Sequence, residues 1–343
     1  MWDGCAHTGG LYPDRSGAGD FFSYGANLVK TLGFDTPKIY LSNGYANRDY
    51  INQNWGSAPA TLTALAQKTP IASVLSDAAF SRFILSTFSI GQPDLPWATT
   101  GLTPAELQAE YTQVYDLSVH LLSTYAGKQF IIKNWEGDWQ LLGGTGDKER
   151  NVPTGRIHLY QAYHRVRQKA VTDARSAVSS TSSIQYAIEC NLVLDNFGPR
   201  VHRSVLPAVR PDMVSLSIYE ATNYGWGSGE AAITAEITNR LSKIVSRVRA
   251  VYDPSIPIIV GEFGFPQDDS AFNSTSPDVG NLIATVRSVA ATLGIQGCVW
   301  WQILDNEELT PGVPRGFGLY NRNGSSSSVG SLSAAGTKYS NIL

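Results

Sequence analysis

The sequence predicts an α/β protein folded as a single (β/α)₈ barrel over residues 1–343. From about residue 38, short apolar runs rich in β-branched and aromatic residues alternate with longer stretches of helical period. This alternation is typical of βαβ units that share a parallel sheet. The length exceeds the usual size of one core but is ordinary for an eight-stranded barrel, and no proline-rich or charged linker divides the chain.

Seven of the eight strands are legible as apolar runs. We expect them at residues 38–41, 82–88, 129–135, 184–190, 213–219, 257–263 and 297–302. The first strand is expected within residues 2–7. It is short or partly missing, because few residues precede a glycine-rich loop.

The segments between the strands carry apolar residues three and four positions apart, which predicts helices. One such stripe begins at Leu107, and the preceding residues 103–106 (Thr-Pro-Ala-Glu) combine a capping residue, a proline at the first helical position and a capping-box glutamate. A further stripe runs from Ile233 to Val248. A later helix is expected to start at residues 276–277 and to end at Gly294, and the tail from Val329 is expected to pack as the last helix.

Composition and charge exclude several classes of partner. The formal net charge of -3 and the pI near 6.0 offer no cationic field for phosphate backbones or anionic lipids, so we expect no nucleic-acid and no membrane partner. No run of 18 apolar residues occurs, and the N-terminus lacks the basic start and apolar run of a signal peptide. The sequence makes no prediction of oligomeric state.

The sequence also predicts no metal and no cofactor. Its five histidines form no His-x-His pair and no two-histidine helix motif; they are His7, His120, His158, His164 and His202. A glycine-rich stretch at residues 143–146 follows no strand directly and lacks the Lys-Ser/Thr ending of a phosphate-binding loop.

Two glutamates stand where a barrel carries its chemistry, at the carboxyl ends of strands. The fourth strand runs into residues 134–139 (Asn-Trp-Glu-Gly-Asp-Trp), which places Glu136 between tryptophans. The seventh strand is apolar until it delivers Glu262, and a carboxylate there is costly unless a function or a partner holds it. Strands four and seven lie on opposite sides of a closed sheet, so both glutamates can face one opening.

Two facing carboxyl groups are what double displacement at a sugar carbon requires. They stand about 5–5.5 Å apart in retaining enzymes, where one attacks the anomeric carbon and the other protonates the leaving oxygen. Their surroundings must set unlike pKa values. We therefore assign Glu136 as candidate general acid/base and Glu262 as candidate nucleophile.

Six further residues are candidates for substrate binding. The tryptophans are candidates because indole faces stack on the C–H surface of a sugar ring. Tyr219 at the sixth strand end can hydrogen-bond the nucleophile. Asn134 shares a strand face with Glu136, and Asn191 directly follows the fifth strand. The tryptophans of this set are Trp135, Trp139 and Trp301.

The strand end at residues 261–264 (Gly-Glu-Phe-Gly), Glu136 on strand four and Trp301 on strand eight resemble clan A glycoside hydrolases, nearest the cellulase-like family 5 group. The resemblance covers residues 38–302, and its sharp part is these strand ends. It implies a (β/α)₈ barrel, retention of configuration and a carbohydrate substrate. This chain departs from the family pattern because Trp135 separates Asn134 from Glu136.

The expected function is a retaining glycoside hydrolase that acts on a β-linked oligo- or polysaccharide, a substrate that favours a secreted or periplasmic location. Alternatives remain open. Asp138 or Glu189 can be the working acid in place of Glu136, and Glu262 can form a buried ion pair with an arginine. A catalytically inactive carbohydrate-binding barrel would keep the tryptophans without needing both carboxylates. The absence of clustered histidines disfavours a metal-dependent hydrolase.

Overall fold

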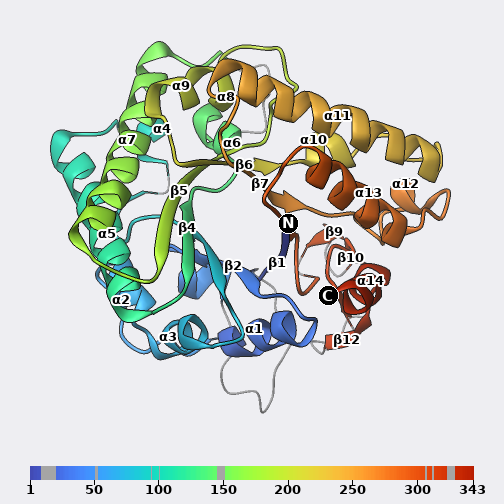
Figure 1. The fold of residues 1–343 in the computed structure, drawn as a ribbon, viewed down its shortest axis with the longest axis horizontal. Helices are drawn as coiled ribbons and strands as arrows, with labels where there is room; N and C mark the ends of the chain where they lie inside the picture. The colour runs from blue at the N-terminus through green and yellow to red at the C-terminus, as the bar shows by residue number, and fades with distance from the viewer. Residues whose placement is uncertain are drawn as a thin grey trace.

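Eight parallel strands close into a barrel in the order β1 to β8, with helices around it (Figure 1). The computed structural model describes residues 1–8, 21–50, 53–93, 95–99, 101–144, 151–305, 307–310, 313–322 and 329–343. The barrel strands are β1 (Trp2–Ala6), β2 (Thr36–Leu41), β3 (Arg82–Thr87), β4 (Gln129–Lys133), β5 (Ser183–Cys190), β6 (Met213–Ser217), β7 (Ile258–Phe263) and β8 (Gly297–Trp300). The predicted (β/α)₈ fold is confirmed.

The first strand has five residues, as many as β4 and β6, and it closes the barrel. β1 pairs with β2 through Gly4 and Thr36, and with β8 through Trp2 and Gly297. β3 ends one residue earlier than predicted, and β4, β6 and β8 end two residues earlier, because the last residues of the predicted runs already belong to the loops at the barrel mouth.

The longer helices are α1 (Phe21–Thr31), α3 (Thr69–Ser76), α5 (Pro104–Thr124), α7 (Thr154–Ala177), α11 (Glu230–Val251), α13 (Val279–Thr292) and α14 (Ala334–Ile342). The predicted capping box at the start of α5 is confirmed: the Thr103 hydroxyl accepts from the Glu106 backbone N–H, and the Glu106 side chain accepts in return.

The start of α13 was predicted three residues too early. Ser276 lies in the left-handed region at φ 47°, and the helix begins at Val279. The cap is Asp278, whose carboxylate accepts from the Asn281 backbone N–H at 3.1 Å. An N-cap residue has an extended backbone, as Asp278 has at φ -75° and ψ 101°, whereas the backbone of Ser276 is left-handed.

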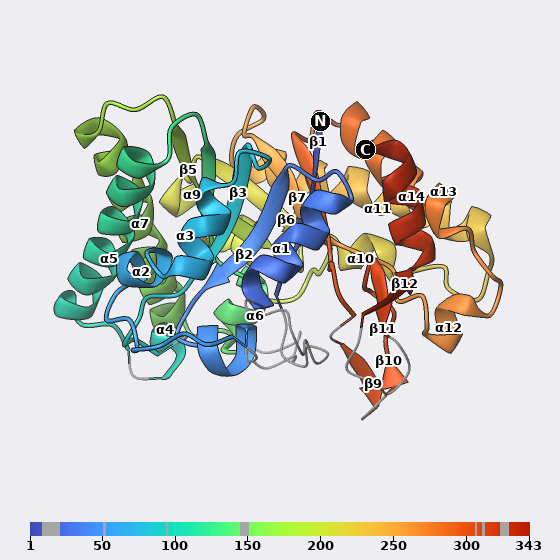
Figure 2. The same ribbon diagram turned by 90° about the horizontal axis from the view of Figure 1, so that it is seen from below.

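Shorter elements lie at the two barrel ends. They are η1 (Tyr45–Asp49, a π-helical turn), α2 (Leu62–Ala66), α4 (Pro96–Thr99), α6 (Gly137–Leu142), α8 (Val201–Ser204), α9 (Leu206–Val209), α10 (Tyr219–Thr222), α12 (Ser270–Asn273), and the small strands β9 (Glu308–Thr310), β10 (Val313–Pro314), β11 (Tyr320–Arg322) and β12 (Val329–Leu332). The expected last helix therefore begins at Ala334, after the strand β12, and not at Val329. Figure 2 shows the start of β1 at one barrel end and α6, β9 and β10 at the other.

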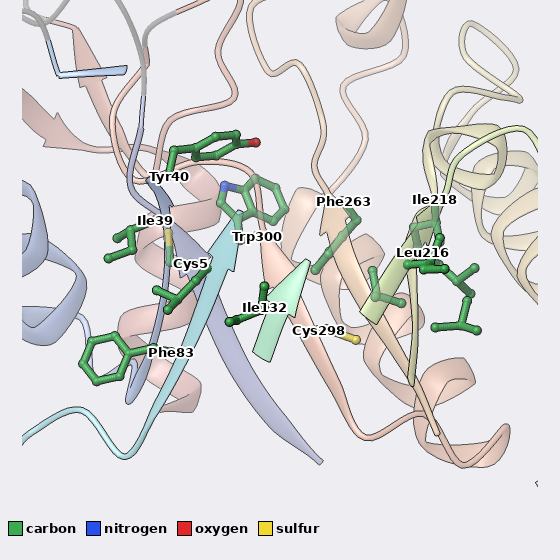
Figure 3. Close-up of a cluster of buried hydrophobic side chains, with 14 of the residues drawn as sticks. Cys5, Ile39, Tyr40, Phe83, Ile132, Leu216, Ile218, Phe263, Cys298 and Trp300 are labelled. Atoms are coloured by element: carbon green, nitrogen blue, oxygen red, sulfur yellow. The ribbon is translucent and has the colours of Figure 1, made fainter. Parts of the chain in front are cut away.

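Two apolar clusters hold the barrel together. The smaller one fills the barrel interior with one residue from each of seven strands: Ala6, Ile84, Ile131, Ala187, Met213, Ile259 and Val299. The larger one lies between the sheet and the helices, and Figure 3 labels some of its members, among them Ile39, Phe83 and Ile132. Because successive strand residues alternate between these two sides, the register tells which side chains face inward.

None of the helices in the described part of the chain is long and apolar enough to span a bilayer.

Candidate active site

A pocket of about 620 Å³ lies at the carboxyl ends of the barrel strands. This volume is typical of a small-molecule site. Seven of the eight residues proposed from the sequence line it: Trp135, Glu136, Trp139, Asn191, Tyr219, Glu262 and Trp301. The further lining residues are Leu192, Ser217, Glu220, Asn223, Tyr224, Glu307, Arg315 and Phe317.

A β-bulge aims Glu262 into the pocket. Ile259 belongs to the interior cluster, so strict alternation along β7 would turn Glu262 outward. However, Val260 pairs with Leu216 and Glu262 pairs with the next β6 residue, Ser217. The extra residue is Gly261, which reverses the alternation after it, as bulges do beside active sites.

Only glycine fits at the bulge. A Cβ on Gly261 would lie 1.9 Å from the Ser215 hydroxyl oxygen and 2.9 Å from a carboxylate oxygen of Glu189. The conformation that presents Glu262 therefore depends on close packing against β5 and β6.

Glu262 is 2% exposed and is held by two groups from β2. The Lys38 ammonium forms an ion pair with its Oε1 and donates to the Gly261 carbonyl at 3.2 Å. The Tyr40 hydroxyl lies 3.5 Å from the same Oε1. Burial raises the pKa of Glu262, while the Lys38 charge opposes that rise. The buried ion pair considered in the sequence analysis therefore exists, but with a lysine instead of an arginine.

Glu136 occupies a tight turn between β4 and α6. Its backbone is left-handed, at φ 37° and ψ 66°, which is rare for a residue with a side chain. The Glu136 N–H donates to Oε2 of Glu189 at 2.6 Å, and the Ser217 hydroxyl donates to Oε1 of Glu136 at 3.4 Å. A Cβ on the following Gly137 would lie 2.2 Å from the Glu189 carbonyl oxygen.

The surroundings of Glu136 favour its protonated form. Burial raises the pKa of its carboxyl well above the ordinary value, and the negative charges of Glu262 and Glu189 raise it further. The Lys38 and Lys133 charges oppose this rise only in part. Burial raises the pKa of both Glu136 and Glu262, but only Glu262 has a lysine ammonium in contact with its carboxylate.

The alternative acid Asp138 is fully buried and bound to backbone. Its carboxylate accepts from the N–H groups of Asn191 at 2.8 Å, Leu192 at 3.0 Å and Val201 at 2.7 Å. It therefore ties the start of α6 to the loop after β5. Asp138 does not line the described pocket.

The second alternative, Glu189, is also fully buried below the pocket. It forms an ion pair with Lys133, and the Ser215 hydroxyl donates to it at 3.0 Å. Its carboxylate thus contacts the turn that carries Glu136 and does not reach the pocket surface.

The two asparagines take part in backbone contacts. Asn134 is 1% exposed and lies behind the described pocket, where its Oδ1 accepts from the Glu189 N–H at 2.9 Å and its amide reaches Tyr160 at 3.2 Å. Asn191 lines the pocket, and its Oδ1 accepts from the Asp138 N–H at 2.8 Å.

Aromatic side chains shape the pocket walls. Trp135 is 38% exposed and Tyr224 is 40% exposed. Trp301 donates from its indole N–H to Glu307. Tyr219, which the sequence suggested as a hydrogen-bond partner of Glu262, packs edge-on against Phe317. The hydroxyl that reaches Glu262 is that of Tyr40.

Sequence reasoning missed Lys38, Tyr40 and Ser217. A signal existed for Lys38, because a lysine inside an apolar strand-like run needs a buried partner. Glu307 and Arg315 also line the pocket, but no sequence signal marked them, since they belong to the long connection after β8.

The described ranges contain no group of three histidine, cysteine, aspartate or glutamate side chains placed to hold a metal ion.

Comparisons with solved structures find this barrel among glycosidases. The chain is similar to a GH5_18 from Bifidobacterium longum subsp. infantis, with 16% identity, a TM-score of 0.62 and coverage of 100% of this chain and 78% of the other. A GH5_18 from Bifidobacterium longum subsp. longum in complex with Manβ1-4GlcNAc matches at 14% identity and a TM-score of 0.59, over 94% and 72%.

A family 5 xyloglucanase from Paenibacillus pabuli matches at 16% identity and a TM-score of 0.57, over 99% of this chain and 97% of the other. No protein-family model matches the chain, and no curated protein matches it by sequence. The chain therefore shares the (β/α)₈ barrel fold of these family 5 structures.

Proposed function

We propose that the chain is a glycoside hydrolase that cleaves a β-linked oligo- or polysaccharide by double displacement, with retention of configuration. The observation that carries this proposal is that Glu136 and Glu262 line one pocket in unlike surroundings. Glu262 has a lysine ammonium on its carboxylate, whereas burial and the negative charges of Glu262 and Glu189 raise the pKa of Glu136. Carboxyl groups whose surroundings separate their pKa values are suited to separate acid and nucleophile roles.

In the first step, Glu262 attacks the anomeric carbon while Glu136 gives its proton to the glycosidic oxygen. The carbon–oxygen bond breaks, the aglycone leaves as an alcohol, and a glycosyl ester forms on Glu262. In the second step, the Glu136 carboxylate takes a proton from water, whose oxygen attacks the same carbon. The ester bond breaks, the sugar leaves with its original configuration, and both side chains return to their starting states.

The aromatic wall supports a sugar substrate. Trp135, Trp139 and Trp301 offer flat apolar faces beside the two glutamates, and such faces stack on the C–H side of a pyranose ring. The structurally similar proteins include a GH5_18 in complex with a mannose-containing disaccharide and a xyloglucanase, which agrees with this substrate class.

The test begins with hydrolysis of a panel of aryl β-glycosides and β-glycans, with the anomer of the first product read by proton NMR. We expect a β product from a β substrate. Glu262→Ala is expected to lose turnover and to recover it with azide, giving the α-glycosyl azide, because azide enters the space of the missing carboxylate. Glu136→Ala with azide is expected to give the β-glycosyl azide.

Glu236→Gln is the matched control, because Glu236 lies on α11 outside the lining of the pocket, where its carboxylate pairs with Arg240. We expect this variant to keep its turnover. Wild-type turnover in Glu262→Ala, or an α product at first appearance, would contradict the proposal. Binding without hydrolysis across the panel would favour the inactive carbohydrate-binding barrel.

A further inference from the structure

A second layer of charge lies inside the barrel, directly below the pocket. Lys133 is two residues after Ile131 of the interior cluster on β4, and Glu189 is two residues after Ala187 of that cluster on β5. Alternation therefore points both side chains inward, and both are 0% exposed. They form an ion pair with each other.

Stability alone gives little reason for this pair. Taking two charges out of water costs several kcal/mol per ion, and apolar residues of similar volume often stabilise a core as well or better. The interior cluster beneath it takes one apolar residue from each of seven strands. A buried pair at this level suggests a task connected with the pocket above.

The contacts of Glu189 converge on Glu136. Its Oε2 accepts the Glu136 N–H at 2.6 Å, and its own N–H donates to Asn134, the residue at the start of the same turn, at 2.9 Å. Its carbonyl oxygen leaves no room for a side chain at Gly137. Both the side chain and the backbone of Glu189 therefore hold the left-handed turn that presents Glu136.

We propose that Glu189, kept ionised by Lys133, is a positioning residue for Glu136: it fixes the Glu136 backbone and sets a permanent negative charge beside the Glu136 carboxyl. The inference rests on the proposed function, in which Glu136 is the general acid/base. The negative charge makes proton loss from Glu136 unfavourable until a leaving oxygen takes the proton.

The charged groups around Glu136 come from four strands. Glu262 on β7 and Glu189 on β5 raise its pKa, and Lys38 on β2 and Lys133 on β4 lower it. The uncharged Ser217 hydroxyl on β6 donates to its Oε1. Because Glu189 raises the pKa of Glu136 more than Lys133 lowers it, loss of the whole pair should lower that pKa.

The charge can be removed without removing the hydrogen bond. In Glu189→Gln the amide oxygen still accepts the Glu136 N–H. Burial lowers the pKa of Lys133, and the Glu189 charge is the main group that opposes this, so its loss favours a neutral lysine in the variant. The double variant Glu189→Gln/Lys133→Met reaches the same charge state and contains no unpaired ion, which protects its folding.

The decisive measurement is the titration of the Glu136 carboxyl by ¹³C NMR, assigned by comparison with Glu136→Gln. We expect the Glu136 pKa to fall by about one unit in both variants, at the lower end of the range for a single neighbouring charge. The alkaline limb of kcat/KM should move down by the same amount. Turnover should fall more for aryl glycosides with basic leaving groups than for dinitrophenyl glycosides, which need no acid.

The matched control is Glu110→Gln/Arg167→Met, which removes another fully buried ion pair, between α5 and α7 and away from the pocket. It should leave the Glu136 titration unchanged. The inference is overturned if Glu136 titrates alike in wild type and in the two Glu189 variants, or if the control moves it equally. Because the NMR titration needs no substrate, it decides the role of Glu189 even if the chain hydrolyses nothing.

Discussion

Replacing Lys38 by methionine tests what holds the candidate nucleophile ionised. Methionine keeps most of the apolar stem and removes the ammonium that contacts Glu262. The side chains of this pair are 0% and 3% exposed, so water cannot substitute for the lost charge. The Glu262 carboxyl in the variant is then buried without a cation in contact.

The magnitude follows from this geometry. An opposite charge in contact with a carboxyl lowers its pKa by about 1–3 units, so its loss should raise the pKa of Glu262 by as much. Each unit makes the ionised form tenfold rarer at a pH below the pKa. We therefore expect kcat/KM on the acidic limb to fall about 10- to 1000-fold, with partial recovery as the pH rises.

Stability should change with pH in a defined direction. Removing one partner of a buried pair costs about 3–5 kcal/mol where the remaining charge persists. In the variant, the folded pKa of Glu262 lies above its unfolded value, so stability is retained at low pH and lost as the pH rises through the folded pKa. The difference from wild type should be smallest near pH 4 and larger at pH 8.

The assays are the pH profile of kcat/KM on a chromogenic β-glycoside and urea unfolding at both pH values. Since Glu136 and Glu262 interact, the profile reports apparent values for the pair. Lys30→Met is the control, because the exposed Lys30–Asp77 pair should contribute at most about 1 kcal/mol. An unmoved acidic limb, or an equal stability loss at both pH values, would refute the reasoning.

Three further predictions concern stability and activity together. Gly261→Ala should lose about 1–3 kcal/mol of unfolding free energy and most turnover, because its Cβ would lie 1.9 Å from the Ser215 hydroxyl oxygen. The control is Gly155→Ala on α7, whose Cβ meets nothing within 4 Å and which should not lose stability. Urea unfolding compares the two variants. Asp138→Asn should lose about 1.5–3 kcal/mol of unfolding free energy, because it weakens three hydrogen bonds from backbone N–H groups to a charged carboxylate. The dependence of its turnover on the leaving group should stay that of the wild type, and a change in that dependence would restore Asp138 as the acid. Thr103→Ala should cost about 0.5–2 kcal/mol in thermal unfolding with unchanged kcat, and an activity change would mean that α5 acts on the pocket.

The fold was predictable because its signals are local. An apolar run followed by a helical stripe specifies a βα unit, and Thr103 with Glu106 marks a helix start within four residues. The start of α13 was misplaced because serine and aspartate are both acceptable caps, and only the left-handed backbone at Ser276 leaves Asp278 as the cap.

The site was predictable in outline, because barrels place their polar groups at the strand ends. The position of Glu262 was legible, but its direction was not. Period-two alternation from Ile259 points it away from the pocket, and only the bulge at Gly261 turns it back. A bulge arises from the pairing of three strands, which a single strand's sequence does not reveal.

By itself, the sequence determined the order of strands and helices, the parallel barrel and the strand ends that carry glutamates. The tertiary structure decided which carboxyl faces the pocket and which is buried beneath it. Lys38 and Glu262 are 224 residues apart, and Lys133 and Glu189 are 56 apart. A carboxyl's pKa depends on burial and on nearby charge, and both are set only when distant strands close into one barrel.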